Sequence, residues 1–197
     1  TLNEGEGSDF DYLLEKTINI GTPKTSDDDN QMSRMTALKA LKNIQFTYNL
    51  TNDDGIPLAS QLEEVIETYK RLNIVKEEVL TNAGFETSAD FTDHLIKGGY
   101  LDDVFDDTNL KTPEELGYEG GNKITIDVAY LAADIHQMAL HIGIGKGFYE
   151  DYGIHVRLNG PYAAGGEVMN ALLSGHSNLG FVGSPPVVSS SINALRS

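Results

Sequence analysis

The sequence contains no cysteine. This absence excludes a disulfide framework, a zinc site built on thiolates and a cysteine nucleophile. It also leaves these 197 residues without the cysteine to which a lipid anchor is attached. No apolar run reaches the roughly 18 residues that a membrane-spanning helix needs. The chain starts at Thr1 rather than at a methionine, so we expect a processed product or a fragment.

Basic residues are few: 14 Lys and Arg stand against 30 Asp and Glu, which gives a formal net charge of −16. Such a surface repels the phosphates of nucleic acids and anionic membranes, so we expect neither as a partner. The charge suits a protein that stays soluble outside a cell or at high salt. Residues 1–122 carry 25 acids and 10 bases, a net of −15, whereas residues 123–197 carry five acids and four bases, a net of −1.

The acidic first part has the pattern of helices. Apolar residues spaced by three over residues 32–44, and an amphipathic pattern over residues 58–72, predict two of them. We expect a third helix over residues 88–96. Ser60 followed by Glu63 predicts a capping box at the front of the second helix. The glycines between residues 117 and 121 indicate a linker.

After the linker the pattern changes to short β-branched runs that alternate with helical stretches. Three strands and three helices follow one another in strict alternation, which is typical of parallel βαβ units in an α/β fold. The predicted strands cover residues 124–130, 154–158 and 178–182. The predicted helices cover residues 135–144, 166–173 and 185–195.

In an open parallel sheet, ligands bind beyond the carboxyl ends of the strands, where loops lead into helices. Residues 131–137, 161–167 and 183–186 are three such loops. Their free backbone N–H groups could face a small anion or a polar group. The alternative is that these loops are simply connections, because every α/β domain contains them.

Motifs for other chemistry do not fit their context. His136 and His141 are five residues apart, which is not the i, i+4 spacing of a shared metal site. Asp134 is better explained as a helix cap that places His136 in the first turn. A phosphate loop follows a strand, whereas the glycines from Gly143 to Gly147 follow a helix, so they do not fit a nucleotide-binding site. We therefore expect no enzyme, metal or cofactor.

Two further motifs are short. Ser184 lies in Gly-Ser-Pro-Pro rather than in the elbow of a serine hydrolase. Asn49 opens an acceptor triplet for N-glycosylation, which matters if the chain is exported.

Two segments carry a resemblance to a known family. Residues 124–152 read ITIDVAYLAADIHQMALHIGIGKGFYEDY, with the signature Lys-Gly-Phe-Tyr-Glu at residues 146–150. Residues 165–186 read GGEVMNALLSGHSNLGFVGSPP. Together they resemble the first lobe of the solute-binding proteins that serve ABC importers of nitrate, sulfonates, taurine and the pyrimidine precursors of thiamin.

The resemblance implies a lobe of the type II periplasmic-binding-protein kind, which closes on a small solute and docks on an ABC permease without catalysis. It implies a location in the periplasm or at the cell surface, and a solute of the nitrate, sulfonate, taurine, bicarbonate or pyrimidine class. Carried over by position, it implies nine ligand-facing residues: Asp134, His136, Gln137, Gly165, Gly166, Glu167, Gly183, Ser184 and Pro185.

The order of the segments departs from that family. The acidic part, with MTALKALKNIQFTYNL at residues 35–50, resembles the tail of the same family placed before its head. A circularly permuted lobe and a junction between tandem repeats both explain this order. We expect residues 1–122 and 123–197 to pack as one lobe.

The second lobe of that family is not part of this sequence. One lobe covers a solute on one side, whereas good sites bury most of a ligand. The alternative function is therefore a self-associating assembly subunit of the cell surface, built from such a lobe without solute capture.

Overall fold

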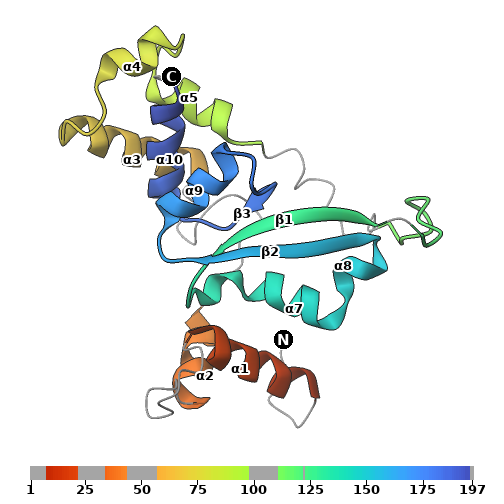
Figure 1. The fold of residues 1–197 in the computed structure, drawn as a ribbon. Coiled ribbons are helices and arrows are strands. Elements are labelled where there is room, and N and C mark those ends of the chain that lie inside the picture. The colour runs from red at the N-terminus through yellow and green to blue at the C-terminus, as the bar shows by residue number, and fades with distance from the viewer. Residues whose placement is uncertain (1–7, 22–33, 44–56, 98–110, 122, 196–197) are drawn as a thin grey trace. The chain divides into compact units, whose positions relative to one another are not determined.

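The computed structural model describes residues 8–21, 34–43, 57–97, 111–121 and 123–195 (Figure 1). The chain divides into two compact units. Unit 1 comprises residues 1–45 and 112–181, and unit 2 comprises residues 46–111 and 182–197. Each unit thus takes residues from the acidic first part and from the later part. That residues 1–122 and 123–197 pack as one lobe stays a prediction.

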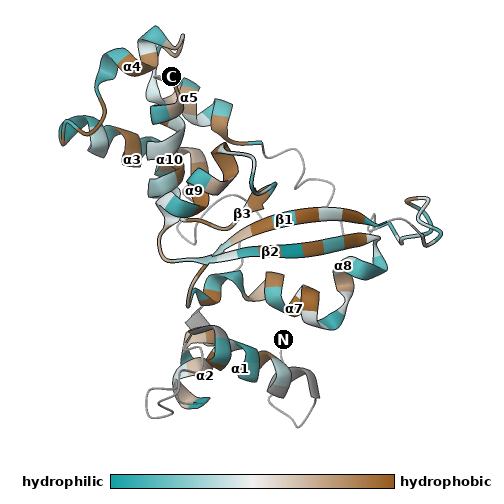
Figure 2. Ribbon diagram, viewed as in Figure 1, coloured by the Kyte–Doolittle hydropathy of each residue, from teal (hydrophilic) through white to brown (hydrophobic). Residues whose placement is uncertain are grey.

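Unit 1 is built on a parallel sheet, which confirms the α/β class. Its strands are β1 (Ile124–Leu131), β2 (Ile154–Tyr162) and β3 (Leu179–Gly180), in the order β2-β1-β3. Each outer strand runs parallel to β1, with Ile124 opposite Ile154 and Ala129 opposite Gly180. Apolar and polar residues alternate along β1 and β2 (Figure 2), because successive side chains point to opposite faces.

Helices cover both faces of this sheet. On one face, the ring of Tyr130 in β1 meets that of His141 in α7 (Met138–Lys146). The other face carries Ala129 and its partner Gly180, and a Cβ on Gly180 would come within 2.9 Å of Val168 in α9 (Gly165–Leu173). The sheet is therefore the middle layer of a three-layer arrangement.

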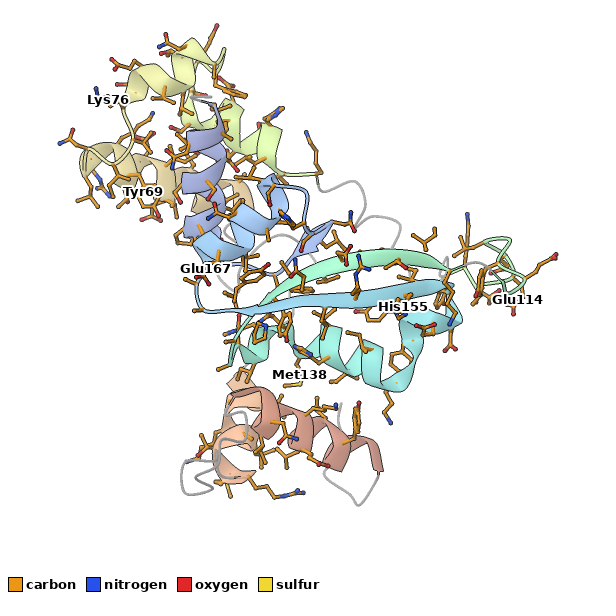
Figure 3. All side chains as sticks on the ribbon, viewed as in Figure 1. Tyr69, Lys76, Glu114, Met138, His155 and Glu167 are labelled. Carbon is orange, nitrogen blue, oxygen red and sulfur yellow. The ribbon has the colours of Figure 1, made fainter. Side chains whose placement is uncertain are left out.

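Helix α1 (Ser8–Gly21) packs against α7, and a second helix, α2 (Arg34–Asn43), packs against α1. Leu14 and Ala37 are buried there. Thr17 of α1 is buried as well, and its hydroxyl lies 3.7 Å from the sulfur of Met138 in α7. Figure 3 places Met138 on the side of α7 toward α1.

Two short elements complete unit 1. The 3-10 turn η2 (Ile135–Gln137) leads directly into α7, so the predicted helix over residues 135–144 begins as a tighter turn. Helix α8 (Phe148–Asp151) follows Gly147, whose φ of 78° ends α7 in the left-handed region that glycine adopts without strain.

Unit 2 is helical. Its helices are α3 (Leu58–Arg71), α4 (Glu77–Asn82), α5 (Ser88–Leu95) and α10 (Ser184–Ala194), and α3 contacts both α5 and α10. Buried apolar side chains from all four helices and from the loop before α4 form one core. Its buried members are Leu62, Ile66, Val75, Leu80, Phe91, Val188 and Ile192.

The predicted helices over residues 32–44, 58–72 and 88–96 are confirmed as α2, α3 and α5. The capping box predicted at Ser60 and Glu63 is wrong, because α3 begins after Pro57 and no side chain caps it. A capping box does open α5. The hydroxyl of Thr87 accepts from the backbone N–H of Asp90, and the carboxylate of Asp90 accepts from that of Thr87. Asn49 lies outside the described residues.

Candidate functional site

The carboxyl ends of β1 and β2 lie next to each other. Leu131 is paired with Tyr162, and the backbone N–H of Ala132 donates to the carbonyl of Tyr162 at 2.8 Å. The loop into η2 and the loop into α9 therefore leave the sheet at the same edge. Two of the three predicted loops are thus neighbours where they begin, as expected for adjacent parallel strands.

Gln137 fixes the first of these loops. Its side-chain oxygen accepts from the backbone N–H of Leu131 at 2.9 Å. Its amide nitrogen donates to the carbonyl oxygens of Leu131, at 3.1 Å, and of Asp134, at 3.3 Å. The residue is 1% exposed. Its polar atoms are engaged within the protein, so this side chain supports the site rather than offering free groups to a solute.

Asp134 caps η2, as predicted. One carboxylate oxygen accepts from the backbone N–H of His136 at 3.0 Å and lies 2.8 Å from Nδ1 of the same residue. This pair orients the imidazole of His136, whose side chain is 79% exposed. The Nε2 atom is therefore presented at the carboxyl edge of the sheet, where it can accept a hydrogen bond, or donate one when protonated.

Glu167 closes the second loop. Its carboxylate accepts from the backbone N–H of Ala163 at 2.8 Å and, more weakly, from that of Ala164 at 3.4 Å. Figure 3 labels Glu167 in the first turn of α9, where a negative charge also interacts favourably with the positive end of the helix dipole. The carboxylate thus occupies N–H groups that an anionic ligand would need.

Gly165 and Gly166 form the start of α9. A Cβ built on Gly166 would meet no atom within 4 Å, so internal packing does not require a glycine there. The space beside Gly166 is open to a solute.

Gly183, Ser184 and Pro185 belong to unit 2. Gly183 precedes α10, and Ser184 and Pro185 lie in its first turn. The carbonyl oxygen of Pro185 accepts from the hydroxyl of Tyr69 in α3 at 3.4 Å. That this third loop joins the other two around a solute stays a prediction.

The charge of the β1–β2 edge differs from that of a simple anion site. Residues 131–137 and 162–167 contain Asp134, Glu167 and His136 but no lysine or arginine. Anion sites are usually built from cations or from unoccupied N–H groups. This edge is better suited to an uncharged or cationic polar solute than to nitrate or a sulfonate.

The glycines of residues 143–147 have structural roles. A Cβ on Gly143 would lie 2.5 Å from the ring of Tyr149, and one on Gly145 would collide with the hydroxyl of Tyr12 in α1. Gly147 ends the helix. The run therefore lets two tyrosines pack closely on α7, and it has no phosphate-loop geometry because it does not follow a strand.

Comparisons with protein-family models, with characterised proteins and with solved structures found no match to this chain. None of the helices in the described ranges combines the length and apolar character needed to cross a bilayer. Within those same ranges, no three His, Asp or Glu side chains gather as metal ligands would.

One polar cluster was not predicted from the sequence. In unit 2, Lys70 donates to the hydroxyl of Ser88 at 2.8 Å and to the carboxylate of Glu67 at 3.1 Å, while Ser88 donates to Glu67. The two hydrogen bonds that Glu67 accepts lower its pKa, and the one from Ser88 has the larger effect. A serine beside a lysine is one arrangement of a nucleophile and its base.

Ser88 does not fit that role. It is 4% exposed and its hydroxyl donates a hydrogen bond to Glu67, so the cluster links α3 to α5. The i, i+3 spacing of Glu67 and Lys70 was readable in the sequence, whereas the contact with Ser88 depends on tertiary packing.

Proposed function

We propose that this chain is an extracytoplasmic solute-binding protein, or a lobe of one, that captures a small polar solute for an ABC importer. The observation that carries the proposal is the common edge of β1 and β2. There the loop that Gln137 holds presents His136 and Asp134, and the neighbouring loop after β2 leads into the open start of α9. Ligands of open parallel sheets bind at such an edge.

Three further features support the proposal. The sequence resembles the first lobe of binding proteins of this kind. The net charge of −16 suits a protein that remains soluble outside the cell. No motif of the sequence carries the residues of a catalytic centre, which favours binding over chemistry.

A thermal-shift screen tests the proposal, because a ligand that binds the folded state raises its melting temperature. The screen covers aminopyrimidines and small amines on one side, and nitrate, taurine, alkanesulfonates and bicarbonate on the other. We expect a shift of several degrees with a compound of the first group. The same shift should be lost in Asp134→Asn and in His136→Ala.

His155→Ala is the matched control, because it removes a half-exposed histidine from the opposite end of β2 and should keep the shift. If the shift persists in the Asp134 and His136 variants, the compound does not bind at this edge. The absence of a shift with any compound would contradict solute capture.

One observation favours the second candidate, a self-associating subunit of the cell surface. Leu179 of β3 and the following Phe181 are 54% and 38% exposed, and both point to the face of the strand opposite to Gly180, which faces α9. Exposed apolar side chains that lie close to one another often belong to an interface. Oligomers that grow with concentration, and that are lost in Leu179→Ser, would favour this function over capture.

A further inference from the structure

His141 lies in the layer between the sheet and α1. Its ring meets Tyr130 of β1 edge-on, with the ring centroids 5.3 Å apart and an interplanar angle of 77°. Its Nε2 atom is buried and has no hydrogen-bond partner among the described residues. A buried ring nitrogen without a partner is tolerated when it is neutral, whereas a charge there would be costly.

His141 lies three residues after Met138 and four before Gly145, and α1 contacts both of these residues, so His141 shares their side of α7. Lys16 of α1 lies 5.4 Å from the ring centre of Tyr12, and Lys146 of α7 lies 4.9 Å from it. The docking of α1 is close at this point, because the Tyr12 hydroxyl packs against Gly145. A proton on His141 would add a third cation near Lys16.

Burial lowers the pKa of His141 below its ordinary value of 6.5, and the charge of Lys16 lowers it further. The docked state therefore takes up a proton less readily than a state in which α1 has left α7. Docking is fully favourable above about pH 6.5 and weakens as the pH falls from there toward the lowered pKa.

The other groups around the imidazole do not provide this response. Tyr130 from β1 meets the ring and the charge of Lys16 from α1 acts on it, while Tyr12 packs on Gly145, Tyr149 on Gly143 and Lys146 lies over Tyr12. Lysines and tyrosines do not ordinarily change charge in mildly acidic water. Burial raises the pKa of Tyr149, so that phenol stays neutral as well.

We infer that His141 makes the docking of α1 on α7 sensitive to pH, so that mild acid releases α1 from unit 1. The release exposes the surface around Met138 and Gly145 while the sheet remains folded. Regulation of this kind is independent of which solute, if any, binds at the carboxyl edge of β1 and β2.

Hydrogen exchange followed by mass spectrometry tests the inference on the intact chain. Exchange of the amides in residues 8–21 is compared at pH 7.5 and 5.5, after correction for the intrinsic effect of pH, with residues 58–71 of α3 as internal reference. We expect corrected exchange of α1 to rise a few-fold at the lower pH, because the docked state binds the proton less well than the undocked state. That of α3 should stay constant.

His141→Phe keeps a ring against Tyr130 but cannot be protonated, so it should abolish the response. Lys16→Met provides a second variant if the first does not fold; it should reduce the response without abolishing it, since burial is the larger cause. His155→Gln should leave it unchanged. An exchange rate of α1 that does not depend on pH in the wild type, or a full response in His141→Phe, would overturn the inference.

Discussion

The two units bury polar groups in different ways. In unit 2, seven buried apolar side chains form one cluster, and the buried hydroxyls of Ser88 and Thr92 have hydrogen-bond partners. In unit 1, Gln137 and the Nε2 atom of His141 are buried close to the sheet, and Nε2 has no partner among the described residues. The difference lies in one atom: the buried hydroxyls of unit 2 are hydrogen-bonded, whereas the imidazole of His141 in unit 1 keeps a buried nitrogen without a partner, at which a proton would be costly.

The largest effect should come from the core of unit 2. Ile66→Ala removes a fully buried side chain from the centre of that cluster and should destabilise the protein by about 3 kcal/mol, because it leaves a cavity. Urea denaturation followed by circular dichroism measures the change. Leu72→Ala, at a side chain that is 62% exposed, should change stability by less than about 0.5 kcal/mol. Equal effects would remove the distinction between core and surface in unit 2.

A pair of glycines tests how tightly α9 packs on the sheet of unit 1. Gly180→Ala places a Cβ 2.9 Å from atoms of Leu172 and Val168, so α9 must shift, at a cost of about 1–3 kcal/mol. Gly166→Ala meets no atom and should stabilise α9 by up to about 1 kcal/mol. Thermal melts of the two variants measure the difference. A Gly166→Ala protein that is stable but has lost a ligand-induced shift would place the solute beside Gly166.

The hydrogen-bonded cluster of Glu67, Lys70 and Ser88 in unit 2 should have a smaller effect on stability. Ser88→Ala removes hydrogen bonds to Glu67 and Lys70 and should destabilise the protein by about 1 kcal/mol at neutral pH. Because the pKa of Glu67 is lowered, this contribution is present above about pH 4.5 and is lost as the pH falls through the lowered value. Stability curves from pH 7 to 3 measure it, with Ser60→Ala as control. A constant difference between wild type and Ser88→Ala would contradict the role of Glu67.

The smallest effect should come from the polar face of the sheet. Arg157 of β2 donates to Asp127 of β1 through two nitrogens, and the guanidinium holds the pKa of Asp127 below its usual range. The arginine side chain is 66% exposed, so solvent and salt screen the pair. Asp127→Asn should lower the melting temperature slightly in dilute buffer and not at all in 0.5 M salt. A loss that persists at high salt would mean that the pair is part of the core.

Much of the secondary structure could be predicted from the sequence because its periodicity is strong. Helix α3 and strand β1 end within one residue of the predicted ends. Helix α4 was missed, since six residues are too few for a helical period to repeat. β2 continues to Tyr162, beyond the predicted end at residue 158. The prediction ended the strand too early because Asn159, Gly160 and Pro161 have the composition of a turn.

The site was predictable in part. Parallel order alone placed the loops after β1 and β2 at one edge, and Asp134 was recognisable as a cap. The partners of Gln137 and Glu167 were not predictable, because amide and carboxylate groups in loops can bind solute or backbone equally well. Tertiary contacts decide between these possibilities, and here Gln137 binds the backbone of Leu131 and Asp134.

Gln137 links the end of β1 to the start of α7. Its side-chain amide hydrogen-bonds to the N–H and the carbonyl of Leu131, the last residue of β1, as a neighbouring strand would. Gln137 is also the residue directly before α7. A displacement of α7 would therefore be transmitted directly to the loop that holds Asp134. Removal of this one amide, as in Gln137→Ala, should therefore disturb the end of β1, the loop of Asp134 and the first turn of α7 together.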